Sequence, residues 1–306
     1  MVKIKPIYNI LDYRSIFFNQ NGNISNHYRL LEDYLNYIEE SVIKYRENFN
    51  TLEELSKDQM PRLNDDIHNK LYGLYDLDNE VTKALKSEIK KHHKSQRQTY
   101  NGLKCVYCGI KRQEAEDLDH YLPRSIFPAY SILSYNLIFV CKTCNQDFKK
   151  ALFVEDDGSR CIINPYFDEI EIYNFLKCTI DFDETTSFSI KYEVVNPDGM
   201  NNPKLLKVVK NHFSRLNLNE RYCHVIGDDC WIEFTNIFTE YDDDDNQYFI
   251  GCINEYNLEI DSRIRALGRT HPSDFEKLFW QALKENQTWL SNLPNRDLKT
   301  GQIINI

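Results

Sequence analysis

Two Cys-x-x-Cys pairs constrain this chain more than any other feature of its sequence. Cys105 and Cys108 form the first pair, and Cys141 and Cys144 form the second, with 32 residues between the pairs. Four thiolates in two tight pairs can close one tetrahedral Zn²⁺ site. A closed site of this kind has no open coordination position, so it stabilises a fold without catalysing a reaction. Any chemistry has to come from residues between and just after the two pairs.

The segment between the pairs carries side chains suited to a second metal ion. Residues 118–125 read LDHYLPRS, and residues 135–145 read YNLIFVCKTCN. The carboxylate of Asp119 and the amide oxygen of Asn145 are hard ligands, which suit Mg²⁺ or Mn²⁺ better than the ion of a thiolate cage. His120 supplies a base beside Asp119. Hydrolysis of a phosphodiester requires a water, a base and a cation.

This pattern resembles the HNH, or ββα-metal, endonuclease family in its four-cysteine form, over roughly residues 103 to 152. The resemblance implies that Asp119 and Asn145 hold one divalent cation and that His120 is the general base. It implies that Asn136 positions the two catalytic segments. It also implies a strand that ends at residues 118–119, a second strand at 137–140, and a short helix that Asn145 opens.

One position departs from the commonest pattern of that family. There a lysine lies three residues after the final asparagine, whereas here Phe148 takes that position and the lysines are Lys149 and Lys150. Lys149 is therefore displaced by one residue from the place of a phosphate contact. Lys149 and Arg124 are nevertheless expected to bind nucleic acid.

The distribution of charge favours a nucleic-acid partner although the chain as a whole carries −10. Residues 83–104 hold seven lysines and arginines against a single glutamate, and this stretch leads into the first cysteine pair. A local basic surface of this kind attracts phosphates. The predicted contacts on this helix are Lys86, Lys90, Lys94 and Arg97. The alternative is a basic helix face that is simply solvated.

Periodicity and turn residues predict an α+β protein with a central ββα-metal core and cysteine knuckles. The flanking parts are a mainly helical region at 1–102 and a mixed α/β region at 153–306, with the core at 103–152. Helical patterns cover residues 27–49, 63–75, 79–98 and 204–218, and strand patterns cover 176–182 and 187–195. Capping boxes at 51–54 and 273–276 predict two further helix starts, the second helix ending near residue 290.

Composition predicts a cytoplasmic protein without a membrane span. No apolar run approaches the roughly 18 residues of a membrane helix, and the first residues lack the apolar segment of a signal peptide. Five further cysteines are scattered singly and are expected to be buried, reduced thiols: Cys161, Cys178, Cys223, Cys230 and Cys252.

Two functions of different classes are consistent with these observations. The first is a metal-dependent endonuclease with structural zinc and catalytic Mg²⁺ or Mn²⁺, with DNA favoured and RNA open. The architecture resembles nuclease subunits of bacterial anti-phage systems of the Septu and retron-associated kind, which implies a possible ABC-type ATPase partner. The second is a zinc-stabilised adaptor that binds nucleic acid or protein without cutting.

Overall fold

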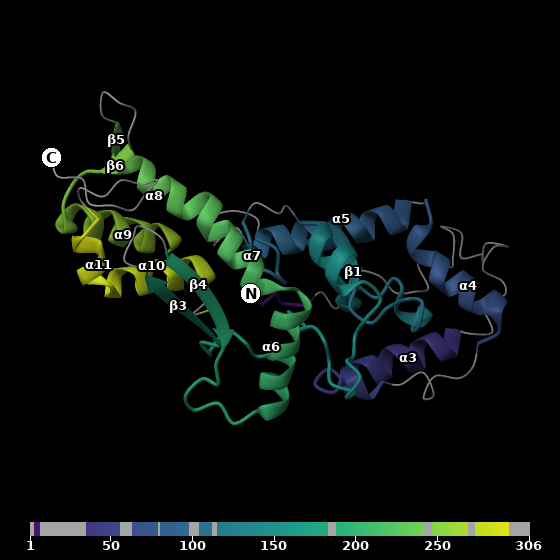
Figure 1. Ribbon diagram of the computed structural model, residues 1–306. Helices are drawn as coiled ribbons and strands as arrows, with labels where there is room; N and C mark the ends of the chain where they lie inside the picture. Colours follow the sequence, from purple (N-terminus) through teal and green to yellow (C-terminus); the bar gives the residue numbers. More distant parts are fainter. Residues whose placement is uncertain are drawn as a thin grey trace. The chain divides into compact units, whose positions relative to one another are not determined.

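The chain folds into α-helices and short antiparallel strand pairs (Figure 1). The structure is a computed structural model, and it describes residues 3–6, 35–55, 63–78, 80–97, 104–111, 115–182, 188–241, 247–268 and 273–293. Contacts group the chain into two units, Met1–Ile170 with Asn202–Leu216 and Glu171–Asn201 with Asn217–Ile306. The first unit therefore holds both the predicted helical region and the predicted core.

The first unit contains the antiparallel pair of β1, Ala115–His120, and β2, Leu137–Cys141. In its register Asp119 lies opposite Ile138, and His120 lies opposite Leu137. All five residues of β2 are buried. This burial explains the unbroken apolar run of β2, because a strand covered on both faces does not alternate with polar residues. The two strands predicted for the core are thus confirmed.

A helical segment, η6, follows β2 and spans Thr143–Lys149. It is a π-helix, in which hydrogen bonds run from residue i to residue i+5. Asn145 is its third residue, whereas the sequence predicted that Asn145 would open the helix. The order of two strands and a helical turn is the one that the sequence predicted.

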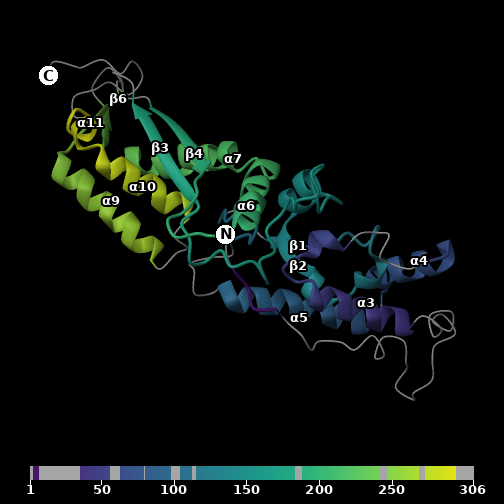
Figure 2. The ribbon, with the colours of Figure 1, turned by 90° about the horizontal axis from the view of Figure 1, so that it is seen from below.

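In its described residues the first unit also contains these α-helices: α3, Leu35–Glu47; α4, Asp65–Gly73; α5, Glu80–Arg97; and α6, Pro203–Arg215. Short 3₁₀ turns lie at Leu52–Glu54 (η1), Leu74–Asp76 (η3), Pro128–Tyr130 (η4) and Ser134–Asn136 (η5). Helix α5 packs along β2, as Figure 2 shows. These helices match the predicted patterns, except that residues 27–34 lie outside the described ranges and that α6 ends before residue 218.

The second unit is built on a hairpin of β3, Leu176–Phe182, and β4, Phe188–Val194. Helix α10, Phe275–Glu285, packs on β3 and on α9, Ile253–Leu267 (Figure 2). The unit also contains α7, Leu218–Val225; η7, Ile226–Trp231; α8, Ile232–Ile237; β5, Thr239–Tyr241; β6, Gln247–Phe249; and α11, Gln287–Ser291. The predicted hairpin is confirmed, whereas the predicted last helix is divided at Asn286.

Both predicted capping boxes differ from the caps that form. The Thr51 hydroxyl does not cap η1 and instead donates to Asn48 Oδ1 over 3.3 Å. The cap of α10 is Asp274, whose Oδ1 accepts the Lys277 N–H over 3.2 Å. Ser273 is occupied elsewhere, because its hydroxyl accepts the Phe175 N–H over 2.8 Å. A tertiary contact thus moved the cap by one residue.

The scattered cysteines are less buried than the sequence predicted. Only Cys161 among the five is buried, and Cys252 is exposed. Buried positions were therefore wrongly expected for four of these residues. None of the nine cysteines, all of which lie in the described ranges, forms a disulfide. In the part of the chain that the structure describes, no helix combines the length and the apolar character needed to cross a bilayer.

Candidate metal centre and catalytic pocket

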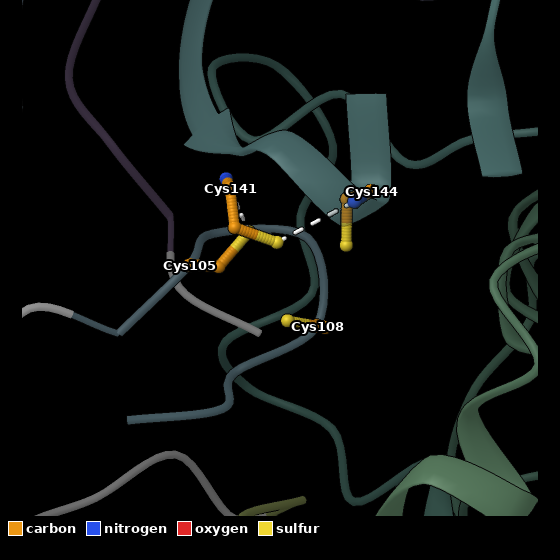
Figure 3. Close-up of side chains that lie close together, drawn as sticks. All are labelled: Cys105, Cys108, Cys141 and Cys144. Carbon is orange, nitrogen blue, oxygen red and sulfur yellow. Dashed lines mark hydrogen bonds between the residues drawn. The ribbon is translucent and has the colours of Figure 1, made fainter. Parts of the chain in front are cut away.

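The four cysteines of the two pairs come together in one buried cluster, and Figure 3 shows their side chains turned toward a shared space. Their sulfur atoms all lie within 4.8 Å of one another. Four sulfurs at about 2.3 Å from one Zn²⁺ stand about 3.8 Å apart in a tetrahedron. The cluster could therefore hold a metal ion such as zinc after small side-chain movements.

Backbone N–H groups support this thiol cluster. The Cys141 N–H donates to Cys105 Sγ over 3.3 Å, and the Cys144 N–H donates to Cys141 Sγ over 3.4 Å. Such donors stabilise the negative charge that a metal-bound thiolate carries. Gly109 closes the first pair with a φ of 73°, a conformation that glycine adopts without steric cost, and its N–H bonds to Cys105 O.

A pocket of about 190 Å³ lies in the first unit beside β1. The two predicted cation ligands and the predicted base, Asp119, Asn145 and His120, all line it. The complete lining consists of Tyr72, Leu118, Asp119, His120, Pro123, Arg124, Ser125, Asn145, Lys150 and Ala151. Residues 26 positions apart in the sequence are thus brought to one cavity.

His120 is a neutral imidazole with a defined tautomer. Its Nε2 lies 2.8 Å from the carbonyl oxygen of Ser131. A carbonyl can only accept, so Nε2 carries the proton and Nδ1 keeps its lone pair. Burial lowers the pKa of His120 to about 3, and the ring is therefore uncharged at neutral pH. The Tyr75 ring packs against the imidazole at 4.6 Å. Its unprotonated Nδ1 is the atom that could accept a proton, and the low pKa makes the imidazole a weak base.

Asp119 is buried and already engaged by two donors. The Tyr107 hydroxyl donates to its Oδ2 over 2.7 Å, and Lys149 Nζ donates to its Oδ1 over 2.9 Å. Lys149 Nζ also donates to the carbonyl oxygen of His120 over 2.9 Å. The Lys149 side chain is 0% exposed, which contradicts the predicted contact between Lys149 and nucleic acid. An ammonium group enclosed in this way offers no face to a phosphate.

The π-helical form of η6 explains why Lys149 reaches Asp119. Hydrogen bonds from i to i+5 place more residues in each turn than the α-helical bonds do. Lys149 is four residues after Asn145. In a π-helix it lies on about the same side as the residue three positions after Asn145 would in an α-helix. The one-residue displacement of the lysine in the sequence is compensated by the helix geometry.

Asn136 is fully buried and uses all the hydrogen-bonding capacity of its amide. Its Oδ1 accepts the Leu122 N–H over 2.8 Å and the Tyr45 hydroxyl over 3.2 Å. Its Nδ2 donates to the carbonyl oxygens of Leu122 and Tyr130, each over 3.1 Å. The amide thereby joins the segment after His120 to the turn before β2. This arrangement fits the positioning role implied by the resemblance.

Asn145 lines the pocket with an amide that is held through its nitrogen. Its Nδ2 donates to Asp117 Oδ2 over 3.2 Å, and Gln146 Nε2 donates to the same oxygen over 2.7 Å. The Asn145 oxygen remains the atom that can ligate a cation. Asp117 and Asp119 are two residues apart on β1, so their side chains emerge from the same face of the strand.

A second metal ion would depend on few protein ligands. Among the described residues, the four-cysteine cluster is the only group of three or more histidine, cysteine or acidic side chains close enough to share an ion. Asp119 and Asn145 would therefore supply two ligands, and water and substrate oxygens would supply the others. Mg²⁺ is commonly bound with this small number of protein ligands.

Arg124 forms part of the pocket wall in a fixed orientation. Its Nη1 donates to Asp76 Oδ2 over 2.7 Å and to the Tyr72 carbonyl oxygen over 3.1 Å. Its guanidinium lies 4.1 Å from the centre of the Tyr72 ring. The side chain is 20% exposed, so it reaches solvent while it is held. A guanidinium placed in this way is suited to a phosphate oxygen.

The predicted basic residues of α5 differ in their surroundings. Lys86 Nζ lies 3.9 Å from the centre of the Tyr75 ring, and Lys90 Nζ lies 5.5 Å from that of Phe139, so both are partly buried. Lys94 is exposed. The side chain of Arg97 lies outside the described part of the structure. Lys86 connects the basic helix to the ring that packs on His120.

Sequence reasoning missed two residues of this site. Tyr107 lies between the first two cysteines and binds Asp119, so it connects the thiol cluster to the pocket. A tyrosine inside a cysteine pair gives no periodic signal that would reveal this contact. Lys150 lines the pocket in place of Lys149. Adjacent lysines in a sequence cannot be told apart without knowledge of the helix type.

Comparison with known proteins gives a limited match. No protein-family model matches the chain, and no solved structure matches it significantly. Over 122 residues the chain is 29% identical to protein ea31 of Escherichia phage lambda. The match covers 40% of this chain and 40% of that protein, so the chain spans less than half of the relative's length.

Proposed function

We propose that this protein is a metal-dependent endonuclease of the HNH type that hydrolyses phosphodiester bonds in nucleic acid. The observation that carries the proposal is the single pocket shared by Asp119, His120 and Asn145. In that pocket a neutral imidazole lies beside oxygen ligands of the kind that bind Mg²⁺ or Mn²⁺. A base and hard ligands at one cavity are the parts that metal-assisted hydrolysis requires.

His120 has the defined role of general base in this proposal. Its Nδ1 takes a proton from the attacking water, while the Nε2–H bond to Ser131 O holds the ring and favours the imidazolium that forms. A divalent cation on Asp119 and Asn145 would stabilise charge on the phosphate and the leaving oxygen. Asp119 can keep its bonds to Tyr107 and Lys149, because each carboxylate oxygen has two lone-pair sites.

The four-cysteine cluster holds a structural Zn²⁺ in this proposal. Its position supports the role, since Cys141 ends β2 and Cys144 lies in η6, the segment that carries Asn145. Tyr107, inside the first pair, donates to Asp119. Metal binding at the cysteines would therefore fix the elements that form the pocket.

The proposed substrate is DNA, with RNA as the alternative polymer. In this proposal Arg124 and the exposed Lys94 would contact backbone phosphates, and such contacts do not depend on base sequence. The preference for DNA, a role in anti-phage defence and an ABC-type ATPase partner all rest on the family resemblance. They are proposals about the whole protein that a genetic test in infected cells would address.

A second candidate function is a zinc-stabilised adaptor that binds nucleic acid or protein without cutting it. The observation in its favour is that Asp119 is 2% exposed and that each of its carboxylate oxygens already accepts a hydrogen bond. A cation would have to approach a carboxylate paired with an ammonium group, and like charges would weaken its binding. The two functions differ in cleavage, which can be measured directly.

Cleavage of plasmid DNA and of RNA by the purified protein tests the proposal, with Mg²⁺ or Mn²⁺ titrated from zero. We expect nicking that requires the cation and that is abolished in His120→Ala. His224→Ala is the matched control, because His224 is exposed in the second unit, where it pairs with Asp228. That variant should cut at the wild-type rate.

Two outcomes would contradict the nuclease proposal. Cleavage that persists in His120→Ala would point to a contaminating enzyme or to another site. Binding of nucleic acid without cleavage at any cation concentration would favour the adaptor.

A further inference from the structure

Lys150 lies directly after η6 and lines the pocket together with His120 and Asn145. Its side chain is exposed, in contrast to the buried Lys149 beside it. Its N–H donates to the carbonyl oxygen of Asn145 over 2.8 Å. The backbone of Lys150 is therefore fixed to the residue that supplies the amide ligand.

The backbone of Lys150 has an unfavourable conformation for a lysine. Its φ is 53° and its ψ is −134°, a combination that side chains with a Cβ rarely adopt. In the described part of the chain, the other non-glycine residue with positive φ is Asn217, and asparagine tolerates the left-handed region. Glycine would suit position 150 better on conformational grounds. A lysine in such a position indicates that its side chain has a use.

Lys150 also differs from the other basic residues at the site in its ion pairs. Arg124 pairs with Asp76, and Lys149 pairs with Asp119. Within the residues that the structure describes, Lys150 forms no ion pair. The pocket thus presents one lysine whose ammonium group can approach a ligand without breaking an existing salt bridge.

We propose that Lys150 is the side chain that binds the scissile phosphate, and that Lys149 serves only as the internal partner of Asp119. The proposal rests on the proposed nuclease function for the identity of the phosphate. A lysine is suited to this role because its ammonium is a compact charge with three donors on a flexible stem. Lys150 would neutralise a phosphate oxygen with its ammonium group. Its backbone N–H bond to the Asn145 carbonyl oxygen fixes position 150 beside the residue that supplies the proposed amide ligand.

Lys150→Gly tests whether Lys150 binds phosphate or serves the fold. A phosphate-binding role predicts lost activity in a stable protein, whereas a role in folding predicts lost stability with normal binding. Relief of the backbone conformation should leave the thermal midpoint unchanged or raise it by about 2 °C. Loss of the ammonium should lower the cleavage rate by about 10²-fold, as loss of one charge-stabilising donor typically does. Lys150→Arg keeps the charge and should retain most of the activity.

Binding is measured separately with a labelled DNA duplex in the His120→Ala background without divalent cation. Adding Lys150→Gly should weaken binding and lower the salt slope by about 0.9, the value for one lost phosphate contact on a duplex. Lys142→Gln is the charge-matched control, since Lys142 is exposed and does not line the pocket. This control should leave affinity and slope near those of the parent.

The outcomes separate this inference from the nuclease function. Wild-type affinity and slope in Lys150→Gly overturn the role of Lys150, as does an equal loss in Lys142→Gln. A lower thermal midpoint of Lys150→Gly with normal binding assigns the lysine to folding and overturns it too. If the wild type cuts neither DNA nor RNA, the nuclease function fails. The binding titration alone then decides whether Lys150 contacts phosphate.

Discussion

Lys149 Nζ lies 2.9 Å from Asp119 Oδ1, and the two side chains expose 0% and 3% of their surfaces. The pair joins the end of the π-helix η6 to the residue before His120. A hydrogen bond from Lys149 Nζ to the carbonyl oxygen of His120, the last residue of β1, strengthens the connection. A buried pair of this kind binds the elements together, and its loss is costly because it leaves one charge unpaired.

Lys149→Met should therefore lower the free energy of unfolding of the first unit by about 3–5 kcal/mol. The reason is that the Asp119 carboxylate would keep a single hydrogen-bond donor, Tyr107, in a buried position. Chemical denaturation followed by fluorescence measures the change. The double variant Asp119→Leu with Lys149→Met removes both charges and should recover much of the loss. A single variant as stable as wild type would show that the pair is not buried in solution.

The sequence predicted the elements of the core but not the contacts of its lysines. Local patterns were sufficient for the two strands, since β2 is a short apolar run between turn signals and the second cysteine pair marks the turn that ends it. Lys149 is buried against Asp119 and Lys150 lines the pocket, and this arrangement depends on η6 being a π-helix. No local propensity in residues 143–149 distinguishes a π-helix from an α-helix, so the sequence could not show which lysine reaches Asp119.

The N-cap of α10 is a second feature that the local sequence did not predict correctly. Ser273 and Asp274 both have side chains that cap helices, and the sequence alone favoured Ser273 because of the glutamate three residues later. The Phe175 N–H takes the Ser273 hydroxyl, so Asp274 becomes the cap. Residues nearly 100 positions apart decided the outcome, which lies beyond any local pattern.

Burial of His120 should make stability depend on pH. The pKa of the folded imidazole is about 3, and that of the unfolded chain is about 6.5. Above pH 6.5 both states are neutral and His120 has no effect. As pH falls from 6.5 toward 3 the unfolded state takes up the proton first, so stability decreases by up to about 1.4 kcal/mol per pH unit.

Denaturation curves between pH 5 and 6.5 for wild type and His120→Gln test this expectation. Glutamine does not titrate, so the difference in unfolding free energy between the two proteins should shrink steadily as pH decreases. Other titrating groups contribute equally to both proteins and cancel in the comparison. A difference that stays constant over this range would mean that the imidazole is hydrated in the folded state.

Removal of one cysteine ligand should unfold the core around the pocket. Structural zinc contributes on the order of 10 kcal/mol to the folding of small domains. With the proposed Zn²⁺ on the four cysteines, Cys105→Ser should lose the metal and the cooperative transition of the first unit. Elemental analysis and thermal denaturation measure the two effects. Cys252→Ser is the control, because Cys252 is exposed at the start of α9. A folded Cys105→Ser protein without metal would refute the structural role.

Neutralising the basic face of α5 should weaken nucleic-acid binding without changing sequence preference. Lys94 is exposed, so Lys94→Gln should lower the salt slope on duplex DNA by about 0.9 if the lysine contacts one phosphate. Lys83→Gln on the same helix is the control, because Lys83 already pairs with Asp78 at 2.7 Å. Equal slopes for wild type and Lys94→Gln would make this face an ordinary solvated surface.

Separate measurement of cleavage and cation binding distinguishes the proposed base from the proposed cation ligands. His120→Ala should lower the cleavage rate by about 10² to 10⁴-fold, the usual value for a positioned base, with cation affinity preserved. Asn145→Ala removes one neutral oxygen ligand from the pocket, so its rate should recover as the Mg²⁺ or Mn²⁺ concentration is raised. Asp119→Asn should reduce both quantities, since the carboxylate is the charged ligand of the proposed cation site.

Asn136→Ala adds a fourth case to this comparison. Two of its four hydrogen bonds hold Leu122, two residues after His120, so the rate should decrease while cation affinity is kept. Its unfolding free energy should also decrease, because buried partners such as Leu122 lose their bonds. The assignment of roles would be wrong if His120→Ala lost the cation while Asp119→Asn retained it. In that case His120 would be a ligand, and another group would have to take the proton from water.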